Sequence, residues 1–208
     1  DPRYRLTSKE LKAAIEKATL DEVKEYYADQ FGLNRGEVAI VGDFDAKAVK
    51  AQLEKILKEK TSKVPYERII RKHFDTPGTR IIIDTPDKEN ATIVARFDFA
   101  QNKGEPDSDA MLLANWIFGG STGLSNRLML RLRQKDGLSY GAGSNVNIPA
   151  FGNDASWTMQ AILAPQNLRK AEVALYEEID CVIKDGFTQE ELDEAKKGFI
   201  EYRAVNRS

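Results

Sequence analysis

An arginine and a tyrosine, seven residues apart, have the types and spacing best suited to chemistry on a polypeptide. Arg133 lies near the end of a predicted helix, Tyr140 opens the next predicted strand, and Gly137 separates them. A guanidinium is a fixed fork of N–H donors and a phenol adds an O–H donor. The pair could therefore hydrogen-bond a peptide carbonyl or polarise one that is to be cleaved. On local pattern alone, a surface arginine and an interface tyrosine are the simpler interpretation.

The sequence cannot supply the ligands of a histidine-rich zinc site. Zinc peptidases commonly place two histidines on one helix face, and this chain has one histidine, His73. His73 lies in a basic stretch that is predicted to be a solvated strand or linker. The single cysteine, Cys181, excludes an internal disulfide, and its apolar-periodic surroundings favour a packed small hydrophobe. We therefore predict no catalytic residue, no metal and no cofactor in this chain.

A glycine-rich segment at residues 119–123 invites comparison with a phosphate-binding loop. Such a loop needs a lysine and a hydroxyl residue after its last glycine, and here Leu124 and Ser125 follow. The segment is predicted to be a turn between two helices, the first of which ends at Gly119 and Gly120.

The composition is that of a globular chain with mixed charges. Of 208 residues, 41% are hydrophobic and 31% charged, and the net charge is −2. Acidic and basic residues are interspersed rather than gathered into a basic field, so nucleic-acid binding is disfavoured. No apolar run approaches the roughly 20 residues of a membrane helix, and we predict no membrane span.

The first 78 residues are predicted to form a group of helices with one strand, followed by an extended connection. Two capping boxes, at Thr7 and Thr19, predict two helices within residues 8–30. The apolar run 37–41 predicts a strand, and the apolar spacing from Val49 to Leu57 predicts a further helix. Prolines and basic residues between 58 and 78 then indicate an extended, solvated connection.

The later residues predict an α+β fold in which helices pack on one face of an antiparallel sheet. Strands are predicted at 80–84, 91–99, 140–148 and 156–162, and helices at 107–118, 125–136, 167–184 and 190–203.

Several stretches occur in the order typical of the pitrilysin and insulinase family of zinc metallopeptidases, which the chain resembles. They are Ala39–Asp45, Gly119–Gly120 with Leu124–Leu128, Leu130–Arg133 with Gly137–Tyr140, and the segment 186–192. The chain is also similar to mitochondrial processing peptidase subunits. In this family one domain carries an inverted zinc motif, HxxEH, and a homologous second domain closes over the substrate.

The resemblance implies a domain organisation, because no HxxEH occurs here. Residues 1–60 would be the helix-helix-strand-helix tail of a preceding homologous domain, 61–78 a linker, and 79–208 the second, non-zinc domain, C-terminally incomplete. Zinc is expected in the missing catalytic half, on the same polypeptide or on a partner subunit. A further hypothesis is that residues 8–57 complete the second domain, as a permuted or swapped element.

The resemblance also implies roles for four residues. Arg133 and Tyr140 stand at the spacing of the arginine and tyrosine that hold the substrate backbone near the metal in this family. Gly119 and Gly120 correspond to the family's glycine turn, expected to pack closely near the substrate cleft. The implied partners are a peptide or unfolded polypeptide and a zinc-bearing domain or subunit, and the implied location is the periplasm.

Two rival functions stay open at this level. The parent could be a zinc-less relative that acts as a structural or partner subunit, or the chain could be a binding module unrelated to peptidases. An HxxEH motif in the parent's other half would separate the first rival from a working peptidase.

Overall fold

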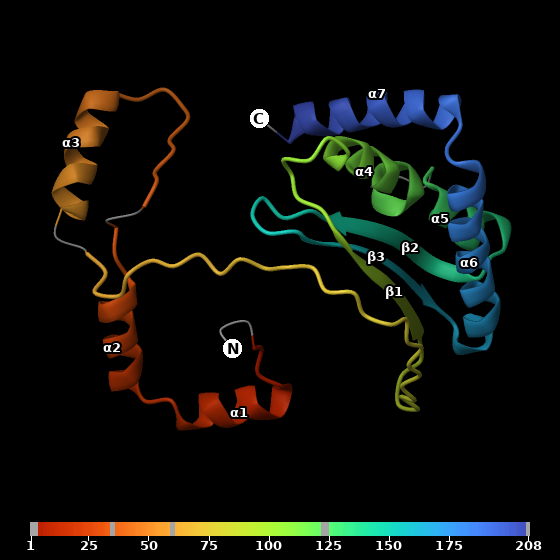
Figure 1. Cartoon of the computed structure of the whole chain (residues 1–208), viewed down its shortest axis with the longest axis horizontal. Coiled ribbons are helices and arrows are strands. Elements are labelled where there is room, and N and C mark those ends of the chain that lie inside the picture. Colours follow the sequence, from red (N-terminus) through yellow and green to blue (C-terminus); the bar gives the residue numbers. More distant parts are fainter. Residues whose placement is uncertain (1–3, 34–35, 59–60, 122–124, 207–208) are drawn as a thin grey trace. The chain divides into compact units, whose positions relative to one another are not determined.

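The computed structural model describes residues 4–33, 36–58, 61–121 and 125–206 (Figure 1). The chain divides into two compact units, Asp1–Ile69 and Ile70–Ser208. Residues 122–124, which belong to the predicted interhelical turn and to one of the family-like stretches, lie outside the described residues.

In the first unit the described residues form three helices, α1 (Ser8–Lys17), α2 (Leu20–Gln30) and α3 (Ala46–Leu57). Both predicted capping boxes are present, since the Thr7 and Thr19 hydroxyls accept backbone N–H groups and the third helical residue returns a carboxylate. Among the described residues between 4 and 69, none is buried. The described residues of this unit therefore form helices without a buried core.

The second unit is built on a three-stranded antiparallel sheet with the order β1-β3-β2. Its strands are β1 (Ala91–Ala100), β2 (Ser139–Asn147) and β3 (Asp154–Leu163). All three predicted strands that lie in this sheet are confirmed. Because β3 is central, the order of the strands in the sheet differs from their order in the chain.

Helices cover one face of this sheet (Figure 1). They are α4 (Ser108–Asn115) with the π-helical η1 (Trp116–Gly120), α5 (Arg127–Met129) with the π-helical η2 (Leu130–Lys135), α6 (Leu168–Asp185) after the short 3-10 helix η3 (Pro165–Asn167), and α7 (Gln189–Val205). The core joins alternate residues of β3, such as Trp157 and Met159, to Phe118, Leu128 and Leu132 from the helices. The predicted α+β fold is confirmed.

Two predicted strands are wrong. Residues 37–41 and 80–84 form no strand in the described structure, although both runs are apolar. A strand needs a neighbour for its backbone hydrogen bonds, and neither segment has one within its unit. Ile81, Ile82 and Ile83 are accordingly 68–78% exposed. At the start of the second run, Arg80 donates two hydrogen bonds to Glu172 of α6, at 2.6 and 2.8 Å.

The structure corrects two further expectations. The helix predicted to end before Gly119 continues through Gly119 and Gly120 as η1. His73, predicted to be solvated, has a side chain only 15% exposed. It lies against the β2–β3 connection, where its backbone N–H donates to the Asn153 side chain at 2.9 Å and the Asn153 N–H donates to the Arg71 carbonyl at 3.1 Å.

Candidate functional site

Arg133 and Tyr140 lie on either side of a tight helix-to-strand turn. Arg133 is exposed on η2, and Tyr140 is 64% exposed at the start of β2. Gly137 makes the turn with φ of +61°, a left-handed conformation that costs glycine little. The Leu138 N–H closes it by donating to the Leu132 carbonyl at 2.8 Å. Within the described structure the two side chains make no hydrogen bond to each other, and both donors face outward.

A β-bulge lies at Tyr140. Ser139 pairs with Leu163 and Gly141 with Ile162, so Tyr140 is an extra residue in the ladder between β2 and β3. Bulges re-aim a side chain locally and are frequent next to functional sites. At this bulge the Tyr140 side chain is exposed, while the preceding Ser139 is buried.

Gly119 and Gly120 are the last two residues of η1, one of the helical segments that cover the sheet. A Cβ atom on Gly119 would stand 2.7 Å from the Ser144 backbone N, and one on Gly120 would collide with the Asn115 side-chain amide. At position 119, only glycine allows η1 to approach β2 so closely. Gly119 is thus closely packed between helix and sheet, whereas Gly120 is closely packed against Asn115 at the end of α4.

Asn115 connects this helix to the sheet through a polar contact that the sequence did not indicate. Its Oδ1 accepts hydrogen bonds from the Ser144 hydroxyl at 2.8 Å and from the Trp157 indole N–H at 2.9 Å. Two donors from two different strands thus converge on one amide oxygen. These partly buried hydrogen bonds favour one arrangement of the helix and the two strands.

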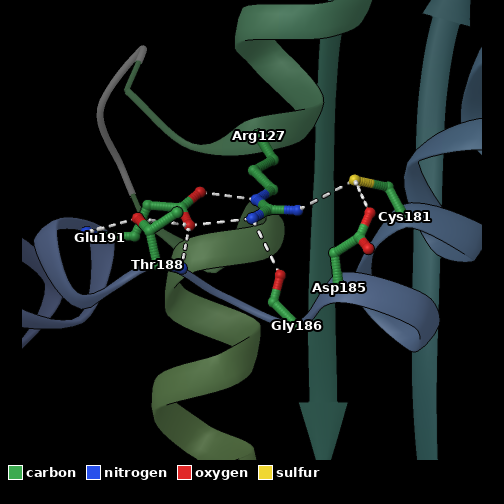
Figure 2. Close-up of polar contacts among 6 residues, drawn as sticks. All are labelled: Arg127, Cys181, Asp185, Gly186, Thr188 and Glu191. Atoms are coloured by element: carbon green, nitrogen blue, oxygen red, sulfur yellow. Dashed lines mark hydrogen bonds and ion pairs between the residues drawn. The ribbon is translucent and has the colours of Figure 1, made fainter.

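An extensive polar cluster surrounds Arg127, at the start of α5 (Figure 2). Its guanidinium donates to both carboxylate oxygens of Glu191, at 2.6 and 2.8 Å, and to the Gly186 carbonyl at 3.0 Å. The Thr188 N–H donates to the same carboxylate at 2.7 Å, and the guanidinium lies 5.0 Å from the centre of the Phe187 ring. We call this set, Arg127 with residues 186–191, the Arg127 clamp.

The clamp is partly shielded from solvent, and its hydrogen bonds lower the pKa of Glu191. The Arg127 and Glu191 side chains are 14% and 27% exposed. The hydrogen bonds from Arg127, helped by those from Thr188, lower the pKa of Glu191 to about 2. The carboxylate therefore stays charged at all ordinary pH values, and the bidentate pair persists with it.

The clamp and the two ion pairs of Arg131 fix the segment that carries Arg133. The clamp ties α5 to the corner between α6 and α7. Arg131, one turn later, donates to Asp136 at 2.8 Å and to Glu177 of α6 at 2.5 Å. Arg133 thus projects from a backbone held at both ends. Arg127 and Glu191 both fall in family-like stretches, but their pairing across 64 residues has no signal in one sequence.

Cys181 lies at the edge of the clamp and is partly buried. Its Sγ is 3.8 Å from Arg127 Nη1 and 3.9 Å from Asp185 Oδ2, as Figure 2 shows. Among the described residues, no group of three or more His, Cys, Asp or Glu side chains is arranged to hold a metal ion. No helix in the described part of the chain combines the length and the apolar composition needed to cross a bilayer.

The chain matches a family and relatives along most of its length. A family model described as the peptidase M16 inactive domain matches residues 17–199. A relative named non-peptidase homolog YmxG, from Helicobacter pylori, is 28% identical over 187 residues, which is 89% of this chain and 42% of that protein.

Solved structures show the same fold. A peptidase M16 inactive domain from Pseudomonas fluorescens has a TM-score of 0.67 and 22% identity, over 97% of this chain and 46% of that one. A protease from Helicobacter pylori also has a TM-score of 0.67 and 22% identity, over 93% of this chain and 45% of that one.

The chain spans less than half the length of these relatives. Because the family model covers far more than half of the chain, the resemblance to the pitrilysin and insulinase peptidases is confirmed. The chain belongs to the peptidase M16 family and carries its C-terminal, inactive domain.

Proposed function

We propose that this chain is the substrate-binding, non-zinc part of a zinc metalloendopeptidase that acts on peptides or unfolded polypeptides. One observation carries the proposal. Two strong donors, Arg133 and Tyr140, are exposed beside one rigid turn, and neither is engaged with another described side chain. The turn already fixes the backbone that carries them, so binding a backbone carbonyl costs the ordering of two side chains and not of the segment as well.

The chemistry is that of binding rather than bond cleavage. Arg133 would hold a substrate carbonyl by its fork of N–H groups, and the Tyr140 phenol would donate to a second oxygen. Zinc-activated water would come from the half that lies outside this chain, and the present residues would position the substrate for it. The chain alone is expected not to cleave peptides.

The first unit provides the candidate contact with that half. Its apolar side chains include Val38, Ile40 and Phe44. Together with Val49 and Leu53 of α3 they line a cavity of about 1010 Å³. A group of helices without a core is not stable by itself, because helices gain most of their stability from packing. We propose that this unit packs against the preceding, zinc-bearing homologous domain. The alternative, that residues 8–57 complete the second unit, stays a prediction.

A second candidate function is that of a zinc-less structural or partner subunit. It is favoured by the name of the Helicobacter pylori relative, a non-peptidase homolog. Both functions allow polypeptide binding, whereas only the first requires a zinc half that cleaves. Peptidase activity of the parent protein, and its loss on removal of zinc, would separate them.

The proposal is tested by the affinity of this chain for a fluorescently labelled unfolded polypeptide, measured by anisotropy. Arg133→Ala and Tyr140→Phe should each weaken binding about tenfold, because each removes a hydrogen bond to the bound backbone. Arg169→Ala and Tyr176→Phe, which change exposed residues of α6, are the matched controls. Equal affinities for all five proteins would place substrate binding elsewhere.

A further inference from the structure

The bulge at the start of β2 decides which face of the sheet Tyr140 occupies. Further along the strand the ladder is regular, with Ala142 opposite Ala161 and Gly141 opposite Ile162. Continued without a bulge, that ladder would bring Tyr140 opposite Leu163. Leu163 is 0% exposed and belongs to the core under the helices. An unbulged strand would therefore point the phenol into the core, because side chains alternate between the faces of a sheet.

Because of the bulge, Ser139 and not Tyr140 occupies the core-facing position of β2 at this point. Ser139 takes the position opposite Leu163 and is 8% exposed, while Tyr140 is 64% exposed. A small residue fits in the core position where a phenol would overfill the packing. The exposure of Tyr140 thus depends on one inserted residue rather than on the general course of the strand.

The Ser139 hydroxyl occupies the centre of this bulge. Its Oγ lies 2.7 Å from the Gly141 carbonyl oxygen and 2.8 Å from the Ile162 carbonyl oxygen, and it accepts the Gly141 N–H at 3.1 Å. One hydroxyl can donate its proton to one carbonyl at a time and accept from an N–H as well. It therefore supplies bonds to backbone groups that the inserted residue displaces from regular pairing.

We propose that Ser139 is the positioning residue that holds the bulge and so presents Tyr140 to a bound polypeptide. Ser139 touches no substrate, and it acts through the backbone of residues 139–141. The effect of Ser139 on polypeptide binding rests on the proposed function above, whereas its effect on the direction of the Tyr140 ring is independent of that function.

Without the hydroxyl, the Gly141 N–H and its neighbouring carbonyls lose a partner in a poorly hydrated place. The bulge then competes with the regular register, in which the tyrosine turns toward the core. Alanine at position 139 should favour that change, whereas threonine keeps a hydroxyl on Cβ and should preserve the bulge. Serine, alanine and threonine thus form a graded set at one position.

The direct test measures the exposure of the Tyr140 ring by NMR of the chain labelled with fluorotyrosine, in the presence of a soluble paramagnetic probe. Tyr140→Phe identifies the resonance. Ser139→Ala should reduce the paramagnetic broadening of this resonance several-fold or split it into two populations, and Ser139→Thr should restore the wild-type value. The inference is overturned if the alanine variant leaves the resonance and its broadening unchanged.

A measurement on the unmodified chain guards against a variant that does not fold. Hydrogen exchange should show the Gly141 amide protected at least about tenfold relative to an unstructured glycine, because its N–H is bonded to Ser139. Exchange at the unstructured rate would contradict the proposal without any substitution.

Polypeptide affinity then links position to function. Ser139→Ala should weaken binding about as much as Tyr140→Phe, and the double variant should be no weaker than either, because both remove one contact. Additive losses would show that Ser139 acts by another route and would overturn the inference. If the wild-type chain binds no polypeptide, the proposed function fails, while the ring-exposure measurement still decides the role of Ser139.

Discussion

The two units of this chain contain similar helices and differ in what those helices pack against. In the first unit, α1 and α2 begin with complete capping boxes, yet none of their residues is buried. In the second unit, α7 begins with the same box, at Thr188 and Glu191, and contributes to a packed layer over a sheet. Local sequence signals are therefore enough to specify a helix, and a core requires elements from elsewhere.

The largest expected effect of this difference is on leucine truncation. Leu128 is 0% exposed in the core of the second unit, and Leu11 is 49% exposed on α1. Leu128→Ala should lower the free energy of unfolding by about 3 kcal/mol, since it leaves a cavity among packed side chains. Leu11→Ala should change it by no more than about 0.5 kcal/mol.

Urea unfolding followed by tryptophan fluorescence measures both variants, because Trp116 and Trp157 lie in the second unit. Because both tryptophans report on the second unit, a loss of similar size for Leu11→Ala would mean that Leu11 is packed in solution and that α1 unfolds together with the second unit. The contrast between the two units would then be wrong.

The same contrast explains what sequence reasoning could and could not predict. Helices place their hydrogen bonds within one segment, so spacing and caps predicted all three helices of the first unit. A strand depends on a neighbour, and the apolar runs 37–41 and 80–84 have none here. The bulge at Tyr140 and the π-helical turns shift the register by single residues, and no period in the sequence reports such shifts.

The candidate site was predictable in part for the same reason. Arg133 and Tyr140 are separated by one turn, so their common neighbourhood follows from local sequence. The Arg127 clamp and the Asn115 contacts join residues tens of positions apart, and only the fold brings them together. The supporting residues of a site are thus harder to identify from sequence than the residues they support.

An intermediate effect is expected for the Arg127 clamp. Glu191→Gln should destabilise the second unit by about 2 kcal/mol at neutral pH, because it leaves a poorly solvated guanidinium without its counter-charge. Arg80 forms a comparable bidentate pair with Glu172, but it is 54% exposed. Glu172→Gln is therefore the matched control and should cost well under 1 kcal/mol.

The clamp also predicts a pH dependence. The pKa of Glu191 is lowered from 4.5 when unfolded to about 2 when folded, so its contribution is complete above pH 4.5 and is lost as the pH falls toward 2. The difference in unfolding free energy between wild type and Glu191→Gln should stay constant from pH 7 to about 5 and shrink below that. A difference that is unchanged at pH 3 would contradict the assigned charge.

The smallest expected effect compares the same capping box in the two units. Thr188→Ala should lower the free energy of unfolding by about 1 kcal/mol, because the lost cap belongs to a helix that unfolds together with the core. Thr19→Ala removes an equivalent bond from α2, where the Thr19 hydroxyl accepts the Glu22 N–H at 3.3 Å. With no buried residue, α2 is not coupled to global unfolding, so this variant should lose helical ellipticity while the urea midpoint stays fixed.

If Thr19→Ala lowers the urea midpoint as much as Thr188→Ala does, the helices of the first unit unfold cooperatively with the second unit. Their apolar faces would then already be covered in solution. The first unit would have no exposed apolar surface with which to pack against a preceding domain, and that proposal would be wrong.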